Sequence, residues 1–190
     1  EHVVGVDYSE EAIKNAQDKF NCESVQFIAD DYREVEGKFD VITMQGVMEH
    51  LDQPWDELQN MLEHHVVDNG CLITSSPSFI NPRGYVWMTL KKLFDVPMSL
   101  TDLHFICPFD MEEFCTKHNY KLDYTSIHQD WGSGDTMIRD FKKRLVNALN
   151  DANMDNSKVE DLLEWMYKAN KYFNPSAATG AIVVYRISKK

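Results

Sequence analysis

The feature that most constrains the fold is a short apolar run that ends on an acid. Val3-Val4-Gly5-Val6 is typical of a buried strand, and Asp7 stands where that strand stops. Ser9 then predicts a helix N-cap, with Glu10 and Glu11 in the first turn, where carboxylates offset the positive end of a helix. Parallel α/β sheets hold ribose hydroxyls with an acid at this position. We therefore expect a parallel sheet with a nucleotide-binding edge.

Strands and helices alternate through the first half of the chain. This alternation favours a parallel sheet whose strands are connected by crossover helices. The predicted strands after the first cover residues 24–29, 39–44 and 71–75, and the predicted helices cover residues 10–20 and 54–68, the second ended by Asn69-Gly70.

The second half departs from simple alternation. Pro77–Leu103 contains a short amphipathic segment, and the residues from Asp110 to Glu113 have the form of a capping box for a helix that ends near His118. A strand at 120–128 and a last strand at 181–187 bracket a long insert, residues 134–179. The insert contains two amphipathic helices, the second with a capping box at Ser157 to Glu160. We expect one domain, residues 1–190.

Composition restricts the class of protein. The 190 residues are 43% hydrophobic and 12% aromatic, as in a globular chain, and carry a formal net charge of −12. That charge argues against nucleic acid or an anionic membrane surface as the main partner. The four cysteines show no CxxC spacing and no run of 18 apolar residues occurs, so we expect reduced thiols, no membrane span and a cytoplasmic location.

The order of these motifs resembles the class I S-adenosylmethionine-dependent methyltransferases. The closest resemblance is to the small-molecule branch that includes the ubiquinone-biosynthesis type. It covers about residues 3–122 and the last strand. The segments that carry it are residues 3–13, 27–31, 39–51, 66–74 and 104–114.

The resemblance implies a Rossmann-like, mostly parallel sheet with helices on both faces and an antiparallel last strand. It implies S-adenosylmethionine as the cofactor and methyl transfer to a small-molecule acceptor. Asp7 would hold both ribose hydroxyls, Asp30 the adenine amino group, and the backbone N–H of Asp31 a ring nitrogen. Tyr8 and Gln45, at the ends of their strands, complete the predicted cofactor-binding set.

The beginning of the chain departs from the family pattern. The first residue is Glu1, and the sequence enters a strand almost at once. The family's first strand and its glycine-rich turn, which lets the backbone approach the cofactor, would come about twenty residues earlier. We therefore expect a chain that is truncated at its N-terminus.

A catalytic role is predicted for His50. In-line displacement at a sulfonium methyl needs mainly positioning, but an oxygen acceptor also needs a base, and a histidine can accept its proton near neutral pH. The alternative is an ordinary surface residue at a helix start. His104 is a weaker candidate that packing would explain equally well. Glu63-His64-His65 predicts a solvated face and no metal site, because adjacent side chains on a helix diverge.

Several alternatives stay open. Asp7 could serve only as a helix cap, and Asp30 and Asp31 could form an ordinary solvated turn. Trp87, Trp131 and Trp165 could line a substrate pocket, although core positions are the commoner role. The insert is a candidate lid or homo-oligomer contact. Two other classes of function compete with methyl transfer: a non-catalytic cofactor-binding or interaction protein, and an NAD-dependent oxidoreductase.

Overall fold

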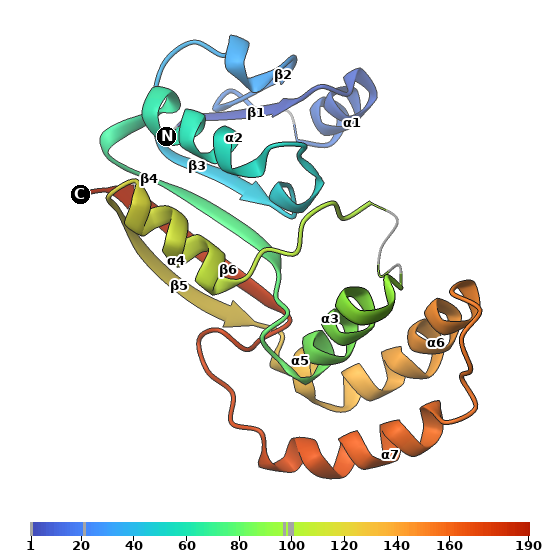
Figure 1. Cartoon of the computed structure of the whole chain (residues 1–190). Helices are drawn as coiled ribbons and strands as arrows, with labels where there is room; N and C mark the ends of the chain where they lie inside the picture. The colour runs from blue at the N-terminus through green and yellow to red at the C-terminus, as the bar shows by residue number, and fades with distance from the viewer. Residues whose placement is uncertain (1, 21, 97, 99–100) are drawn as a thin grey trace. The chain divides into compact units, whose positions relative to one another are not determined.

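The computed structural model describes residues 2–20, 22–96, 98 and 101–190. The chain forms two compact units, residues 1–38 and residues 39–190 (Figure 1). No helix among the described residues is long and apolar enough to span a membrane.

Unit 1 is a single strand–helix–strand motif. Its two strands pair in parallel, from Val3 opposite Val25 to Asp7 opposite Ala29. Val3 is 55% exposed, so the prediction of a fully buried first strand is wrong: within this unit the strand has one neighbour, and the burial of its central residues is partial. The elements are β1 (Val3–Asp7), α1 (Glu10–Phe20), β2 (Val25–Ala29) and the 3-10 turn η1 (Tyr32–Glu34).

Unit 2 is built on a four-stranded sheet with the order β3-β4-β6-β5. Strands β3, β4 and β5 run in one direction, and β6 runs opposite to both of its neighbours. This arrangement confirms the predicted mostly parallel sheet with an antiparallel last strand. The strands are β3 (Phe39–Gln45), β4 (Val66–Pro77), β5 (Tyr120–Ile127) and β6 (Ile182–Lys189).

Strand β4 begins earlier than predicted. Asn69-Gly70 lies inside it, whereas the helix α2 (Pro54–Asn60) ends in one π turn, η3 (Met61–His65). Gly70 therefore does not end a helix, and its lack of a side chain serves a close backbone contact. A Cβ there would lie 2.6 Å from the carbonyl oxygen of Asp40, so only glycine lets the two backbones approach this closely.

Helices α2 and α4 (Pro108–Lys117) cover one face of this sheet. The rings of Trp55 and Phe114 stack with their centroids 5.4 Å apart. Tyr185 and Ile187 of β6 are fully buried, whereas Arg186 between them is exposed, so within unit 2 the expected cover of helices applies to one face. The opposite face carries exposed charges.

Two of the predicted helix starts need correction. Helix α4 begins at Pro108, and the Asp110 carboxylate accepts a hydrogen bond from the Cys107 N–H at 2.8 Å, so Asp110 is the third helical residue and not the cap. Helix α7 begins at Val159, and its cap residue Lys158 makes no side-chain capping bond. In both cases the sequence pattern is offset from the position where the backbone turns.

The remaining helices gather beyond the carboxyl ends of β4 and β5 (Figure 1). They have a hydrophobic core of their own, in which Trp87 and Phe141 meet edge to face at 5.3 Å. Arg83 and Asp140 form a mostly buried ion pair at 3.4 Å. The elements are α3 (Pro82–Phe94), α5 (Gln129–Ser133), α6 (Asp135–Asp151), α7 (Val159–Ala169) and the 3-10 turn η4 (Asn170–Tyr172).

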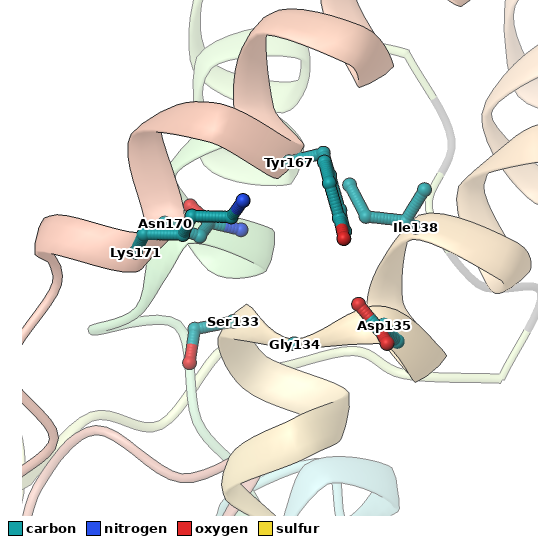
Figure 2. A pocket seen from close by; sticks show the side chains of 7 residues that line it. All are labelled: Ser133, Gly134, Asp135, Ile138, Tyr167, Asn170 and Lys171. Carbon is teal, nitrogen blue, oxygen red and sulfur yellow. The ribbon is translucent and has the colours of Figure 1, made fainter.

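A small hollow lies among these helices. Its volume is about 200 Å³, and Figure 2 shows Tyr167 and Ile138 on one side of it and Asn170 and Lys171 on another. The Lys171 ammonium lies 4.8 Å from the centroid of the Tyr167 ring. Within residues 134–179, predicted as an insert, the structure contains α6, α7 and η4.

Buried Asn81 ties this helical group to the sheet. Its side-chain NH₂ donates to the carbonyl oxygens of Ser78 (3.1 Å) and Gly180 (3.0 Å), and its side-chain oxygen accepts from the Gly84 N–H at 2.7 Å. One residue thus caps α3 and joins the ends of the segments that leave β4 and enter β6.

Candidate functional site

Two carboxylates stand at neighbouring strand ends in unit 1. Asp7 is the last residue of β1 and pairs with Ala29, so Asp30 follows directly on the adjacent strand. The Asp30 N–H donates to the Asp7 carbonyl oxygen at 3.1 Å, which fixes the two residues side by side. The Asp7 Oδ1 accepts from the Ser9 N–H at 2.8 Å. Among the described residues, no partner is found for Oδ2 of Asp7.

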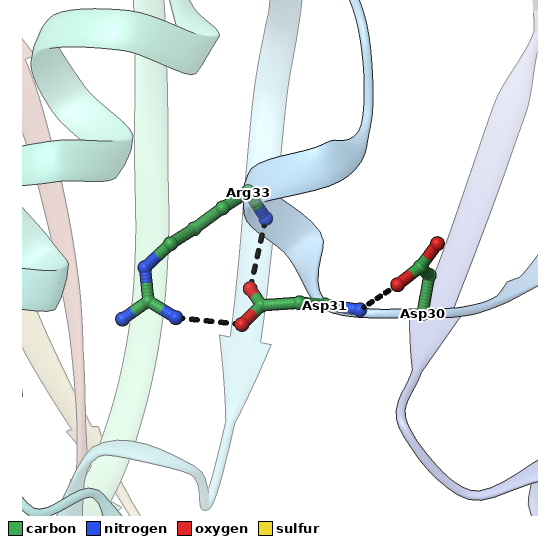
Figure 3. A network of polar contacts seen from close by, with 3 residues as sticks. All are labelled: Asp30, Asp31 and Arg33. Atoms are coloured by element: carbon green, nitrogen blue, oxygen red, sulfur yellow. Dashed lines mark hydrogen bonds and ion pairs between the residues drawn. The ribbon is translucent and has the colours of Figure 1, made fainter.

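The turn after β2 uses its carboxylates locally (Figure 3). Asp30 Oδ1 accepts from the Asp31 N–H at 2.8 Å. Asp31 accepts from the Arg33 N–H at 3.0 Å and from the Arg33 guanidinium at 2.7 Å. The Arg33 N–H is the main reason that the pKa of Asp31 is lowered, with the guanidinium adding to it. The Asp31 N–H proposed for an adenine nitrogen is thus occupied by Asp30 in this structure.

The other predicted cofactor-binding residues differ in their setting. Tyr8 follows Asp7 and is 89% exposed. Gln45 is the exposed last residue of β3, in unit 2. The structure therefore groups Asp7, Tyr8, Asp30 and Asp31 at one end of unit 1 and places Gln45 in the other unit.

The chain turns sharply after β3. Gly46 has a φ of 64°, a left-handed conformation that favours glycine, and its N–H donates to the Ser75 carbonyl oxygen at 2.9 Å. The turn continues into the 3-10 helix η2 (Met48–His50), in which Met48 is fully buried. These two anchors hold Glu49 and His50 at the carboxyl end of the strand.

His50 is oriented by a segment that comes fifty residues later. Its Nδ1 lies 3.0 Å from the Thr101 carbonyl oxygen and 3.6 Å from the Asp102 Oδ1. A carbonyl oxygen can only accept, so Nδ1 carries the hydrogen and Nε2 of the neutral ring keeps its lone pair. The side chain is 42% exposed. This geometry suits a proton acceptor, and Asp102 is a partner that the sequence pattern did not indicate.

Glu49 is the buried member of the same turn. It is 5% exposed, and its Oε2 has no hydrogen-bond partner in the part of the chain that the structure describes. Burial is the main reason that the pKa of Glu49 is raised, while a hydrogen bond from its own backbone N–H and, when the ring is protonated, the charge of His50 oppose that rise. Its backbone carbonyl accepts from the N–H groups of Leu103 (2.8 Å) and His104 (3.2 Å). The turn after β3 and the segment at 101–104 are therefore fastened together.

Other candidate residues have simpler roles. Phe105, next to His104, packs edge to face on Phe79 at 5.4 Å, in agreement with the packing expected for this segment. Glu63 and His64 are exposed, as predicted. Across the part of the chain that the structure describes, no group of three or more His, Cys, Asp or Glu side chains is placed to hold a metal ion.

The tryptophans divide between core and surface. Trp87 is 3% exposed and belongs to the helical core. Trp131 and Trp165 are 43% and 65% exposed, so the core role expected for them is wrong. Neither of these two lines the hollow of Figure 2.

A comparison with models of protein families gives a match to the first part of the chain. The methyltransferase domain family matches residues 1–72. A search of curated proteins finds no match.

Solved structures extend the comparison to the whole chain. A possible histamine N-methyltransferase from Thermotoga maritima is similar with a TM-score of 0.57 and 15% identity, over 98% of this chain and 72% of that one. A mycolic acid cyclopropane synthase, CmaA1, crystallised with S-adenosylhomocysteine, gives 0.54 and 14% over 98% and 68%. The plantazolicin methyltransferase BpumL, also with S-adenosylhomocysteine, gives 0.51 and 14% over 100% and 67%.

The fold is that of the class I S-adenosylmethionine-dependent methyltransferases. At these identities the structural likeness establishes the fold, and the family match adds the sequence signature of its first 72 residues. The fold expected from the sequence motifs is thereby confirmed.

Proposed function

We propose that this chain transfers the methyl group of S-adenosylmethionine to a small-molecule acceptor, with Asp7 and Asp30 binding the nucleoside. The observation that carries the proposal is the pair of acids at adjacent parallel strand ends, joined by the 3.1 Å hydrogen bond from the Asp30 N–H to the Asp7 carbonyl. This is the edge at which α/β sheets bind nucleotides.

The donor set of unit 1 fits an adenosine group. Two cis ribose hydroxyls are hydrogen-bond donors, and the Asp7 carboxylate keeps an oxygen for them while its other oxygen accepts from the Ser9 N–H. An adenine amino group is also a donor, and Asp30 supplies an acceptor. Release of the Asp31 N–H from Asp30 would supply the donor for a ring nitrogen. Tyr8, next to Asp7, is proposed to contact the cofactor as well, and the cofactor-binding role of Gln45, in the other unit, stays a prediction from sequence.

His50 is proposed to accept the proton of an oxygen or nitrogen acceptor. S-adenosylmethionine, when bound, supplies an electrophilic methyl carbon on a sulfonium that leaves as a neutral thioether. In such a transfer, Nε2 of His50 would take the proton that the acceptor atom loses as it is methylated. The Thr101 carbonyl and Asp102 stabilise the ring that gains the charge.

The helical insert is proposed as the cover of the acceptor. Asn81 fixes this group to the chain that leaves β4, beyond the carboxyl ends of the strands where acceptors of α/β enzymes bind. Contact between two copies through the same insert is the second proposal for its role. We also propose a cytoplasmic location and a single methyltransferase domain over residues 1–190.

Calorimetry with S-adenosylhomocysteine and with NAD tests the proposal. We expect the protein to bind S-adenosylhomocysteine and not NAD. Transfer of a labelled methyl group to members of a panel of phenols, alcohols and amines should follow. Binding of NAD without S-adenosylhomocysteine would overturn the methyltransferase proposal in favour of an oxidoreductase, and binding of neither would favour an interaction protein.

A further inference from the structure

Glu49 carries a buried carboxylate oxygen without a hydrogen bond. The residue is 5% exposed, and among the described residues no donor reaches its Oε2. A buried polar atom without a partner destabilises a fold, so such atoms are rare in proteins and concentrate where a ligand or a reaction uses them. The mechanism proposed above makes no use of this side chain.

The surroundings of Glu49 hold its backbone in place but leave its Oε2 without a hydrogen bond. Its backbone carbonyl is held by two N–H groups, those of Leu103 and His104. Its Oε1 would lie 3.6 Å from a Cβ on Gly46, so a residue without a side chain stands beside the carboxyl group. The His104 Nε2, on the segment bonded to Glu49, is a second buried atom for which the described residues provide no partner. Two unsatisfied groups therefore occur where the two segments join.

The charges of this region restrict what could bind there. Asp102 lies 3.6 Å from His50, and both residues act electrostatically on Glu49, His50 lowering and Asp102 raising its pKa. With two carboxylates and one histidine, the cluster disfavours an anion and favours a neutral or cationic group with a hydrogen to donate.

We propose that Glu49 is an acceptor-binding residue whose Oε2 accepts a hydrogen bond from an O–H or N–H group of the methyl acceptor. This inference rests on the proposed function and adds the class of substrate to it. The acceptor is neutral or cationic, and it carries a hydrogen-bond donor in addition to the atom that is methylated.

Substitution of Glu49 separates this role from a structural one. Glu49→Gln keeps the size of the side chain and removes its charge, and Glu113→Gln is the matched control on the exposed surface of α4. If Oε2 is unsatisfied in the free protein, the midpoint of urea denaturation of Glu49→Gln at pH 7.5 will equal or exceed that of wild type. A clear fall in the midpoint, with no fall for Glu113→Gln, would overturn the proposal.

Ligand binding gives an independent readout. In the presence of S-adenosylhomocysteine, 4-hydroxybenzylamine should raise the melting temperature of wild type more than 4-hydroxybenzoate does, and Glu49→Gln should lose this preference. For any acceptor that is methylated, Glu49→Gln should raise KM about tenfold or more with a smaller change in kcat. An unchanged KM, or a preference for the benzoate, would overturn the proposal.

A metal ion is the competing occupant, and it can be tested alone. Magnesium or manganese chloride without acceptor should not change the melting temperature, and EDTA should not change the rate. Stabilisation of wild type by the metal, lost in Glu49→Gln, would assign the carboxylate to a cation instead. Failure of wild type to bind S-adenosylhomocysteine would count against the proposed function, and the denaturation result would still decide the state of Glu49.

Discussion

The turns that follow β2 and β3 each lie at the carboxyl end of a parallel strand. Their acidic side chains differ in exposure and in hydrogen bonding. After β2, Asp30 and Asp31 are exposed, and each accepts a hydrogen bond from a backbone N–H one or two residues ahead. After β3, Glu49 is buried and keeps an unsatisfied oxygen, and the ring of His50 is held by residues 101 and 102.

This difference suggests that the turn after β2 serves ligand binding and that the turn after β3 serves proton transfer. An exposed acid that is already hydrogen-bonded can exchange local partners for a ligand at small cost, which suits reversible binding of a nucleoside. A buried, unsatisfied acid beside an oriented imidazole is a costly arrangement, which suits a place where a proton moves. In the proposed function, the first region binds the cofactor and the second binds the acceptor.

The largest expected effect is in the turn after β3. His50→Asn keeps a side-chain donor for the Thr101 carbonyl but has no basic nitrogen, so the rate of methyl transfer to an oxygen acceptor should fall about 10²- to 10⁴-fold. Initial rates with a labelled methyl group measure this, and the affinity for S-adenosylhomocysteine should stay the same. His64→Asn, an exposed histidine in η3, is the control; equal rates for the two variants would remove His50 from the mechanism.

A smaller effect is expected at Gly46. Alanine at its φ of 64° costs about 1–2 kcal/mol of unfolding free energy, because the left-handed conformation crowds a Cβ. Since this turn also positions Glu49, Gly46→Ala should raise the acceptor KM as well. Gly37→Ala carries comparable strain at φ 98°, in unit 1, and should lower stability without changing that KM. If both variants change KM equally, the acceptor is not tied to the turn after β3.

The smallest effects concern pH, and their signs are opposite in the two turns. Burial raises the pKa of Glu49, so its contribution is favourable below the unfolded pKa and is lost as pH rises through the folded pKa. The Arg33 N–H lowers the pKa of Asp31, so its contribution is present above the unfolded pKa and is lost as pH falls through the folded pKa.

Urea denaturation between pH 3 and 8 measures both signs. Relative to wild type, Glu49→Gln should gain stability as pH rises, and Asp31→Asn should lose stability as pH rises. If the stabilities of the two variants relative to wild type change with pH in the same direction, the carboxylates of the two turns do not have opposite pKa shifts.

The acids of unit 1 could be predicted from sequence because the signal is local. An apolar run, an acid and a helix cap occupy seven consecutive residues, and parallel pairing then places Asp30 beside Asp7. The burial of β1 could not be predicted, because it depends on neighbouring elements and not on the strand itself. The Asn69-Gly70 pattern predicts a helix end, whereas Gly70 lies inside a strand and allows close backbone contact with Asp40.

The site around His50 was predictable only in part. The residue itself stood out by its type and position after a strand. Its partners did not, because Thr101 and Asp102 come from a distant segment with no periodic pattern of its own. The unsatisfied oxygen of Glu49 depends on burial by that segment and has no sequence signal.

Calorimetry of nucleoside binding to Asp7→Asn tests the central claim, that acids at neighbouring strand ends bind one nucleoside. Asparagine keeps an oxygen for the Ser9 N–H and removes the charge, so S-adenosylhomocysteine should bind more weakly by about 1–3 kcal/mol. Wild type and Asp30→Asn should both prefer adenosine to 2′-deoxyadenosine, and Asp7→Asn should lose this preference. An unchanged affinity of Asp7→Asn, with the preference for adenosine intact, would contradict the account.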